Sequence, residues 1–146
     1  MARELLRRRL VRLGAWLFVI GLITGLWAAA VLTEQVKVPI PRLALAAHLN
    51  GLLGGLWLIA VASTLDLLRY GERGLRRLAW LVSIAAWSNW LITLVASVLG
   101  VRGLEYTNDP ANNAVAALLQ VFVVLPSLLG AGAWAVGMRP RGELVR

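Results

Sequence analysis

His48 is the residue of this sequence whose side chain offers the most chemistry. It is the chain's single histidine, it lies in an apolar stretch, and the chain has no cysteine. A neutral imidazole binds iron well, whereas the lack of cysteine excludes disulfides, thiolate zinc sites, iron–sulfur clusters and cysteine nucleophiles. A metal or a haem held here would therefore have one imidazole ligand and an open coordination position. The alternative is that His48 only forms a hydrogen bond across helices, and the two readings carry equal weight.

Other polar side chains recur in the apolar stretches at helical spacing. Two sets have members four or seven residues apart and each form one stripe on a helix: Asn89, Thr93 and Ser97, and Asn113, Gln120 and Ser127. At 1.5 Å per residue, His48 lies about 7 Å and Thr93 roughly 12 Å from the outer ends of their helices, with Gln120 at a similar depth. We expect His48, Thr93 and Gln120 to share one layer that faces a common interior or a subunit interface.

Glycines share the predicted helical face of His48. Gly51 and Gly55 fall within about 60° of the histidine, whereas Asn50 points about 160° away and is expected to lie outside the site. Glycines at this spacing allow two membrane helices to approach closely, which is the favoured interpretation. A sharper hypothesis is that Gly51 and Gly55 also clear space for a flat ligand beside His48.

The elements that position these residues are membrane spans. The 146 residues are 60% hydrophobic and 15% charged, with a mean hydropathy of +0.75, which excludes a soluble enzyme. Four stretches are long enough to cross a bilayer and carry no charge, at approximately residues 13–33, 43–65, 78–101 and 111–138. We therefore predict an all-α fold, an antiparallel bundle of four transmembrane helices that forms a single membrane domain over residues 1–146.

Arginine placement predicts the orientation of this bundle. All fifteen basic residues except Lys37, Arg42 and Arg102 flank the spans on one side, among them Arg139, Arg141 and Arg146. The positive-inside rule places both termini and the middle loop in the cytoplasm. The first stretch imitates a signal peptide, but its length favours a retained helix. We expect an integral protein of the bacterial inner (cytoplasmic) membrane, embedded in the lipid bilayer, and no nucleic-acid partner, because no basic face with interleaved aromatics exists.

No other catalytic set is apparent. The acidic residues lie in predicted loops or at the ends of spans, so there is no serine–histidine–carboxylate constellation and no acid within a span for proton-coupled export. No P-loop or dinucleotide fingerprint is present. Function must therefore be sought around the intramembrane polar residues.

Two segments resemble a known family. Residues 47–55, Ala-His-Leu-Asn-Gly-Leu-Leu-Gly-Gly, look like the Ala-His-x-x-Gly-x-x-Asn-Gly signature of hydroxylaminobenzene mutases, and the distant styrene oxide isomerases are similar there. Residues 88–91, Ser-Asn-Trp-Leu, look like the Ala-Asn-Trp-Leu segment of the mutases, and residues 102–104, Arg-Gly-Leu, resemble a loop of the isomerases. The resemblance covers roughly residues 43 to 137.

The resemblance implies a membrane isomerase or mutase that rearranges a small apolar aromatic substrate, an arylhydroxylamine or an aryl epoxide. It also implies a homo-oligomer, a trimer in the isomerases, that carries haem b with the iron as a Lewis acid. By position His48 would be the iron ligand and Asn89 a site residue, with Thr93 and Gln120 able to donate hydrogen bonds. The haem propionates could reach Arg42, about 9 Å from His48 along the axis, or Arg102.

Three positions depart from the family pattern. The signature asparagine is Gly54, the tyrosine that the isomerases place four residues after the third-span asparagine is Thr93, and their mid-span acid is Ala85. These departures favour two alternatives to a catalyst. One is a haem-binding sensor or carrier without turnover, and the other is a structural or accessory membrane subunit in which His48 only bonds across helices.

Overall fold

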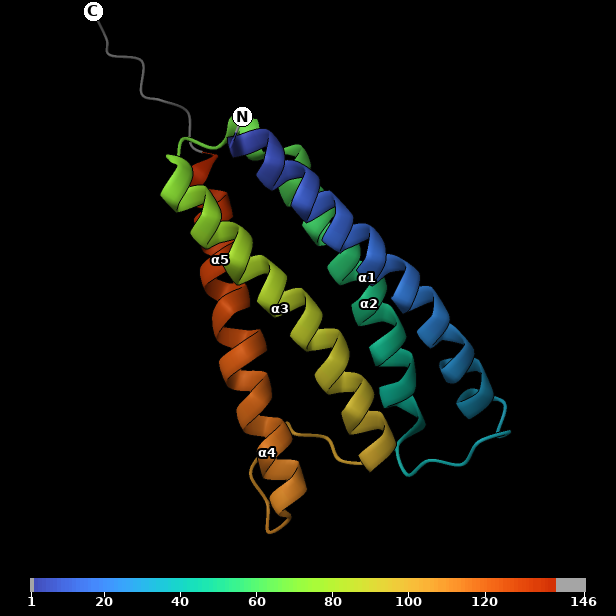
Figure 1. Ribbon diagram of the computed structural model, residues 1–146. Coiled ribbons are helices and arrows are strands. Elements are labelled where there is room, and N and C mark those ends of the chain that lie inside the picture. The colour runs from blue at the N-terminus through green and yellow to red at the C-terminus, as the bar shows by residue number, and fades with distance from the viewer. Residues whose placement is uncertain (1, 139–146) are drawn as a thin grey trace, which may run out of the picture.

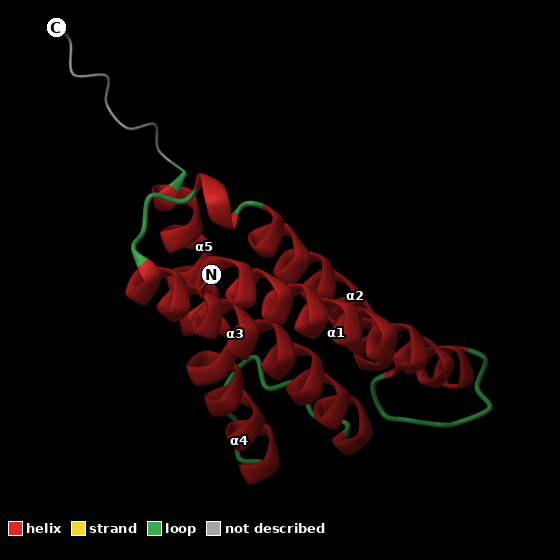
Figure 2. Ribbon diagram, turned by 45° about the horizontal axis from the view of Figure 1, so that its top comes forward, coloured by secondary structure: helices red, strands yellow, loops and turns green. Residues whose placement is uncertain are grey.

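All secondary structure in the described part of the chain is helical (Figure 2). The computed structural model describes residues 2–138, so Arg139, Arg141 and Arg146 of the orientation argument lie outside it. The elements follow one another along the chain as α1 (Ala2–Leu32), α2 (Pro41–Ser63), the 3-10 turn η1 (Leu65–Leu67), α3 (Glu72–Leu99), α4 (Pro110–Leu119), the π-helical segment η2 (Gln120–Val124) and α5 (Leu125–Gly137). The last three form one continuous rod.

Four of these helical stretches are long and apolar enough to cross a membrane, as predicted: Arg3–Leu32, Pro41–Ser63, Glu72–Leu99 and Pro110–Gly137. Two helices start earlier than the uncharged stretches indicate, since α1 begins at Ala2 and α3 at Glu72. Arginine is a good helix former, and its long side chain can reach water from a buried backbone. The charged residues therefore extend the helices beyond the apolar core instead of ending them.

Prolines and a left-handed glycine set the helix boundaries on the side opposite the start of α1. Pro41 and Pro110 occupy the first turns of α2 and α4, where the missing N–H costs nothing. Asp109 caps α4, because its side chain accepts a 2.9 Å hydrogen bond from the amide of Ala111. Helix α3 ends at Gly100, whose φ of +68° suits glycine and few other residues.

Helices α1 and α2 pack against each other over much of their length through glycines. A Cβ atom at Gly51 would lie 2.6 Å from the Cα of Gly21, and one at Gly55 would lie 2.7 Å from the carbonyl oxygen of Gly14. Because such distances are too short for any side chain, glycine is required on these surfaces. The close approach accounts for Gly51 and Gly55, and their role beside a flat ligand stays a prediction.

The start of α1, the connection from α2 to α3 and the end of α5 meet at one end of the bundle (Figure 1). The guanidinium of Arg3 donates a 2.8 Å hydrogen bond to the carbonyl oxygen of Tyr70, and the Tyr70 hydroxyl donates one of 2.7 Å to the carbonyl of Ala133. The amide of Arg69 donates to the carbonyl of Gly137 at 3.3 Å. These contacts hold the basic end of the bundle together.

The rod of α4, η2 and α5 changes from α-helical to π-helical hydrogen bonding just before Pro126. The amide of Leu125 donates to the carbonyl of Gln120, a π-type bond that spans one residue more than an α-helical one. Proline has no N–H to donate, and its ring clashes with the carbonyl four residues before it. A π-helical turn relieves this clash, so the rod continues through η2 into α5.

Candidate functional site

His48 projects from α2 toward α1. Its Nδ1 lies 2.8 Å from the carbonyl oxygen of Gly21. A carbonyl can only accept, so Nδ1 is the donor, and in a neutral imidazole the lone pair is then on Nε2. The half-buried ring lies over Gly25, where a Cβ atom would be 3.0 Å from both Cε1 and Nδ1 of the imidazole. Gly25, which the sequence analysis did not connect with His48, is thus the glycine that makes room for the ring.

The Nε2 atom of His48 remains available to a ligand. It forms no hydrogen bond within residues 2–138. It is also not fully buried, because the one fully buried side-chain nitrogen or oxygen without a partner in these residues is Trp87 Nε1. Nε2 is therefore at least partly accessible. A histidine that binds a metal commonly donates its other ring N–H to a carbonyl in this way, which fixes the tautomer and the orientation of the ring.

Protein side chains alone do not build a metal site in the part of the chain that the structure describes. Residues 2–138 contain no group of three or more His, Cys, Asp or Glu side chains that could hold an ion. A metal at His48 would need most of its ligands from another molecule. A porphyrin brings four nitrogens of its own, so His48 fits a haem as the single protein ligand.

A second polar group connects α2 with α3. The Nδ2 amide of Asn50 donates to Oδ1 of Asn89 at 3.1 Å and to Oγ1 of Thr93 at 3.0 Å. The Thr93 hydroxyl in turn lies 3.5 Å from Asn89 Oδ1. The expectation for Asn50 considered only its direction relative to His48, and the structure shows that Asn50 contacts polar residues of α3 on the other side of α2. A lone amide within an apolar span was the signal that could have identified it.

The three side chains leave two polar groups free. Asn50 and Asn89 are half-buried, and neither Oδ1 of Asn50 nor Nδ2 of Asn89 has a hydrogen-bond partner within residues 2–138. The side-chain oxygen of Asn89 already accepts a hydrogen bond from Asn50, so the NH2 group of Asn89 is the end that can donate to a ligand. The cluster thus offers one oriented donor and one acceptor at the boundary of α2 and α3.

Within one chain the imidazole and the polar cluster face different neighbours. His48 contacts α1, whereas Asn50, two residues later, contacts α3 from almost the opposite side of α2. Within one chain, His48 and Thr93 therefore do not face one common interior, and the alternative of a shared subunit interface stays a prediction. Gln120 is exposed, and its Oε1 lies 3.5 Å from the hydroxyl of Tyr106.

Two asparagines at the start of the fourth span serve the loop that precedes it. Asn113 binds both backbone groups of Thr107, each at 2.8 Å, and the buried Asn112 accepts from the amide of Gly103 and donates to the carbonyl of Glu105. A loop without regular structure needs partners for its backbone groups. This requirement explains why Asn113 turns toward the loop.

Two of the departures from the family signature lie at tightly packed positions. A Cβ atom at Gly54 would lie 3.1 Å from Leu17 Cδ2 and 3.3 Å from the Cβ of Ala86, so a side chain there requires its neighbours to shift. Ala85 is only 1% exposed. Asn50 lies one helical turn before Gly54 on the same face of α2, where its amide does have polar partners on α3.

Arg42 and Arg102 are exposed and form no ion pair or hydrogen bond within the described residues. Arg102 borders a cavity of about 230 Å³ that Glu105 and Asp109 also line. The acids offset its charge, so this cavity is poorly suited to an anion. That Arg42 and Arg102 bind propionates stays a prediction.

Comparison with known proteins agrees with the resemblance noted in the sequence. The model of the styrene oxide isomerase family matches residues 6–139. The hydroxylaminobenzene mutase HabB of Ectopseudomonas oleovorans is 35% identical over 99 residues, which are 67% of this chain and 56% of that protein. The alignment thus spans little more than half of the relative's length. No solved structure matches the chain.

Proposed function

The chain belongs to the styrene oxide isomerase family, and from this premise we propose that it is an integral membrane isomerase or mutase. Its substrate in this proposal is a small apolar aromatic molecule of the arylhydroxylamine or aryl epoxide type, which enters from the lipid. The name of the mutase relative supports the first type and the name of the family supports the second.

The proposal includes the setting of the protein. The bundle is antiparallel, its termini and middle loop face the cytoplasm, and the membrane is the bacterial inner membrane. The contacts that gather Arg3, Tyr70 and Gly137 at one end support this arrangement, because that end also carries most of the arginines. The protein acts as a homo-oligomer, a trimer by analogy with its family.

His48 binds haem b through Nε2 in this proposal, and the observation that carries it is the hydrogen bond from Nδ1 to the carbonyl of Gly21. Bound there, the haem supplies an iron that can act as a Lewis acid toward an oxygen of the substrate. The carbonyl of Gly21 holds the ring in one orientation and one tautomer, and the missing side chain of Gly25 gives the ring its space.

In this proposal Asn89 orients the substrate. An intramolecular rearrangement shifts charge within the substrate and requires no net oxidation or reduction. The free NH2 group of Asn89 donates a hydrogen bond to a substrate oxygen, and such fixed donors stabilise charge that develops in the transition state. Asn50 and Thr93 hold Asn89 in place.

The oligomer brings the two groups of side chains together. His48 and Asn89 face different sides of α2 within one chain, so a substrate that meets both must lie at a boundary between protomers. The accessible Nε2 atom of His48 supports this placement, because a ligand bound to it can lie outside the bundle of one chain.

Turnover tests the proposal directly. Membranes that contain the chain are incubated with styrene oxide or with phenylhydroxylamine, without added oxidant or reductant, and products are identified by chromatography and mass spectrometry. We expect a product with the mass of the substrate, and a loss of this product in His48→Ala. A haem-containing protein that converts neither compound would contradict isomerisation and favour the carrier alternative. A colourless protein without turnover would favour the structural subunit.

A further inference from the structure

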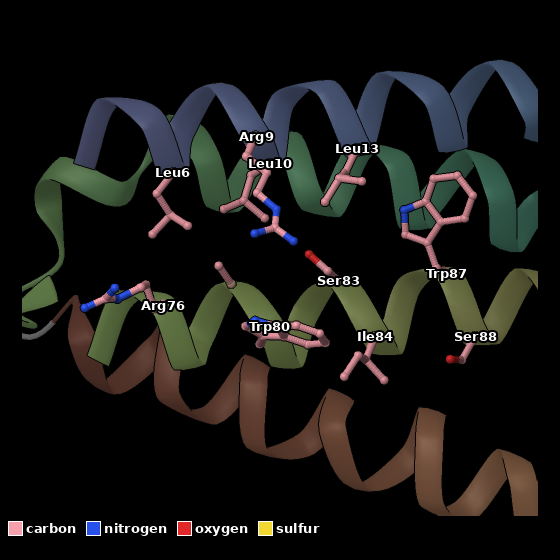
Figure 3. A pocket seen from close by; sticks show the side chains of 11 residues that line it. Leu6, Arg9, Leu10, Leu13, Arg76, Trp80, Ser83, Ile84, Trp87 and Ser88 are labelled. Carbon is pink, nitrogen blue, oxygen red and sulfur yellow. The ribbon is translucent and has the colours of Figure 1, made fainter. Parts of the chain in front are cut away.

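A groove lies between α1 and α3 at the end of the bundle where α1 begins (Figure 3). It encloses about 500 Å³ and has a mostly apolar lining that includes Leu6, Leu10, Leu13, Trp80, Ile84 and Trp87. A cavity of about 240 Å³ continues it and shares Leu6, Arg9 and Arg76. None of the residues of the proposed active site lines either cavity.

Two arginines at the mouth of the groove have no partner within residues 2–138. Arg9 and Arg76 line both cavities and form no ion pair or hydrogen bond there, whereas Arg7 and Arg8 on the same helix pair with acids. Glu72 lines the continuation, together with Arg3, Arg9 and Arg76. The mouth keeps a net positive charge, so it is suited to an anion.

Further donors follow along the groove. Figure 3 shows the Arg9 side chain and the Ser83 hydroxyl directed into the space between the two helices, with the Trp87 ring extending from α3 toward α1. Nε1 of Trp87 is fully buried and has no hydrogen-bond partner in the described part of the chain. Ser83 and Trp87 are four residues apart on α3, about 6 Å along its axis. A ligand with one acceptor at the two arginines and another deeper in the groove could accept hydrogen bonds from all of these donors.

We propose that this groove binds an anionic phospholipid of the surrounding bilayer. Arg9 and Arg76 hold the phosphate, Trp87 Nε1 and Ser83 donate to an ester carbonyl, and one acyl chain covers Leu10, Leu13 and Ile84. A glycerophospholipid carries its acceptors in this order, because the esters lie one glycerol unit beyond the phosphate and the chains follow.

The position of the groove supports a lipid as the occupant. The mouth lies where the arginine-rich start of α1 gives way to the uncharged stretch that begins at Leu13, which is the level of the headgroups. Trp80, beside the groove, is 60% exposed, as is typical of a residue at a membrane interface. Basic pockets between spans on the cytoplasmic side commonly bind anionic headgroups.

Lipid titration with native mass spectrometry tests the proposal. The detergent-purified oligomer is delipidated and titrated with phosphatidylglycerol or with phosphatidylcholine that has the same acyl chains. We expect phosphatidylglycerol to bind more tightly. In Arg9→Gln/Arg76→Gln its affinity drops roughly thirtyfold, since each arginine near an anionic headgroup contributes about a factor of five.

The matched control is Arg8→Gln/Arg77→Gln, which removes the same charge from exposed positions outside the groove. It leaves the affinity within about twofold, as expected for surface charges that are screened. Equal losses in both double variants would overturn the site, because general attraction to the basic end would then explain the binding. Circular dichroism verifies that each variant is folded.

Trp87→Phe tests the hydrogen bond to the ester carbonyl of the lipid, because it keeps an aromatic ring and removes the N–H donor. We expect it to weaken the binding of ester-linked phosphatidylglycerol severalfold and to leave the ether-linked analogue unchanged. Equal affinity of wild type for phosphatidylcholine and phosphatidylglycerol would contradict the proposal. So would dissociation of the oligomer in Arg9→Gln/Arg76→Gln, because a second copy of the chain would then be what covers the groove.

Discussion

The Nδ2 amide of Asn50 lies 3.1 Å from Oδ1 of Asn89, and this contact fixes which end of the Asn89 amide faces outward. A donor held in advance stabilises charge better than one that must reorient during the reaction. In the proposed mechanism Asn50 does not touch the substrate. It is proposed to act on the reaction through Asn89 and Thr93, as a positioning residue.

Asn50→Ala is expected to lower kcat by about ten- to hundredfold with little change in haem content, because a misplaced donor loses transition-state stabilisation. The measurement is steady-state turnover together with the haem-to-protein ratio. Asn113→Ala is the control, since the Asn113 side chain binds only the loop before α4. Unchanged kcat in Asn50→Ala would refute the positioning role, and loss of haem would assign Asn50 to the cofactor site instead.

Gly25→Leu is expected to displace the imidazole and to weaken haem binding by about ten- to hundredfold, the usual effect of disturbing the surroundings of a metal ligand. A side chain at position 25 would begin 3.0 Å from the ring of His48. Haem titration of the apoprotein measures the affinity. Gly132→Leu is the matched control, because nothing lies within 4 Å of a Cβ atom there. Equal haem affinity of both variants would contradict the assigned role of Gly25.

Gly51→Ala is expected to destabilise the bundle by about 1–3 kcal/mol, because its Cβ would overlap the backbone of Gly21 and force α1 away from α2. Thermal unfolding in detergent, followed by circular dichroism, measures the change. Gly132→Ala should leave the Tm unchanged. A normal Tm for Gly51→Ala would mean that the two helices are not packed as described.

Gln120→Ala is expected to keep kcat/KM within about twofold of wild type. Gln120 is exposed and contacts Tyr106, so it lies apart from the cluster at Asn89. The assay is the same turnover measurement. A loss of tenfold or more would restore Gln120 to the active site, in line with the helical spacing of its span.

Hydropathy was sufficient to predict the four spans, because each apolar stretch is long and the loops between them are short. It missed the starts of α1 and α3, since charged residues that favour helices carry no apolar signal. The line of glycines in α2 correctly indicated close helix packing. Its partners Gly14 and Gly21 follow only from the way that α1 lies on α2.

The candidate site was predicted less completely than the fold. The spacing of Asn89 and Thr93 correctly placed both on one face of a helix, and the structure brings them together. The direction of His48 alone does not predict the contact of Asn50 with α3, because α2 has a neighbour on either side. The orientation of Asn113 depends on the loop before α4, whose need for hydrogen-bond partners is not visible in a helical pattern.

The central claim is that His48 binds haem through Nε2, and a visible spectrum of the purified protein tests it most directly. The chain is expressed with full haem supply and purified in detergent as wild type and as His48→Ala. We predict a Soret band in the wild type that is absent from His48→Ala and returns when free imidazole is added to this variant with haem. A colourless wild type, or a variant with an unchanged Soret band, would contradict the account.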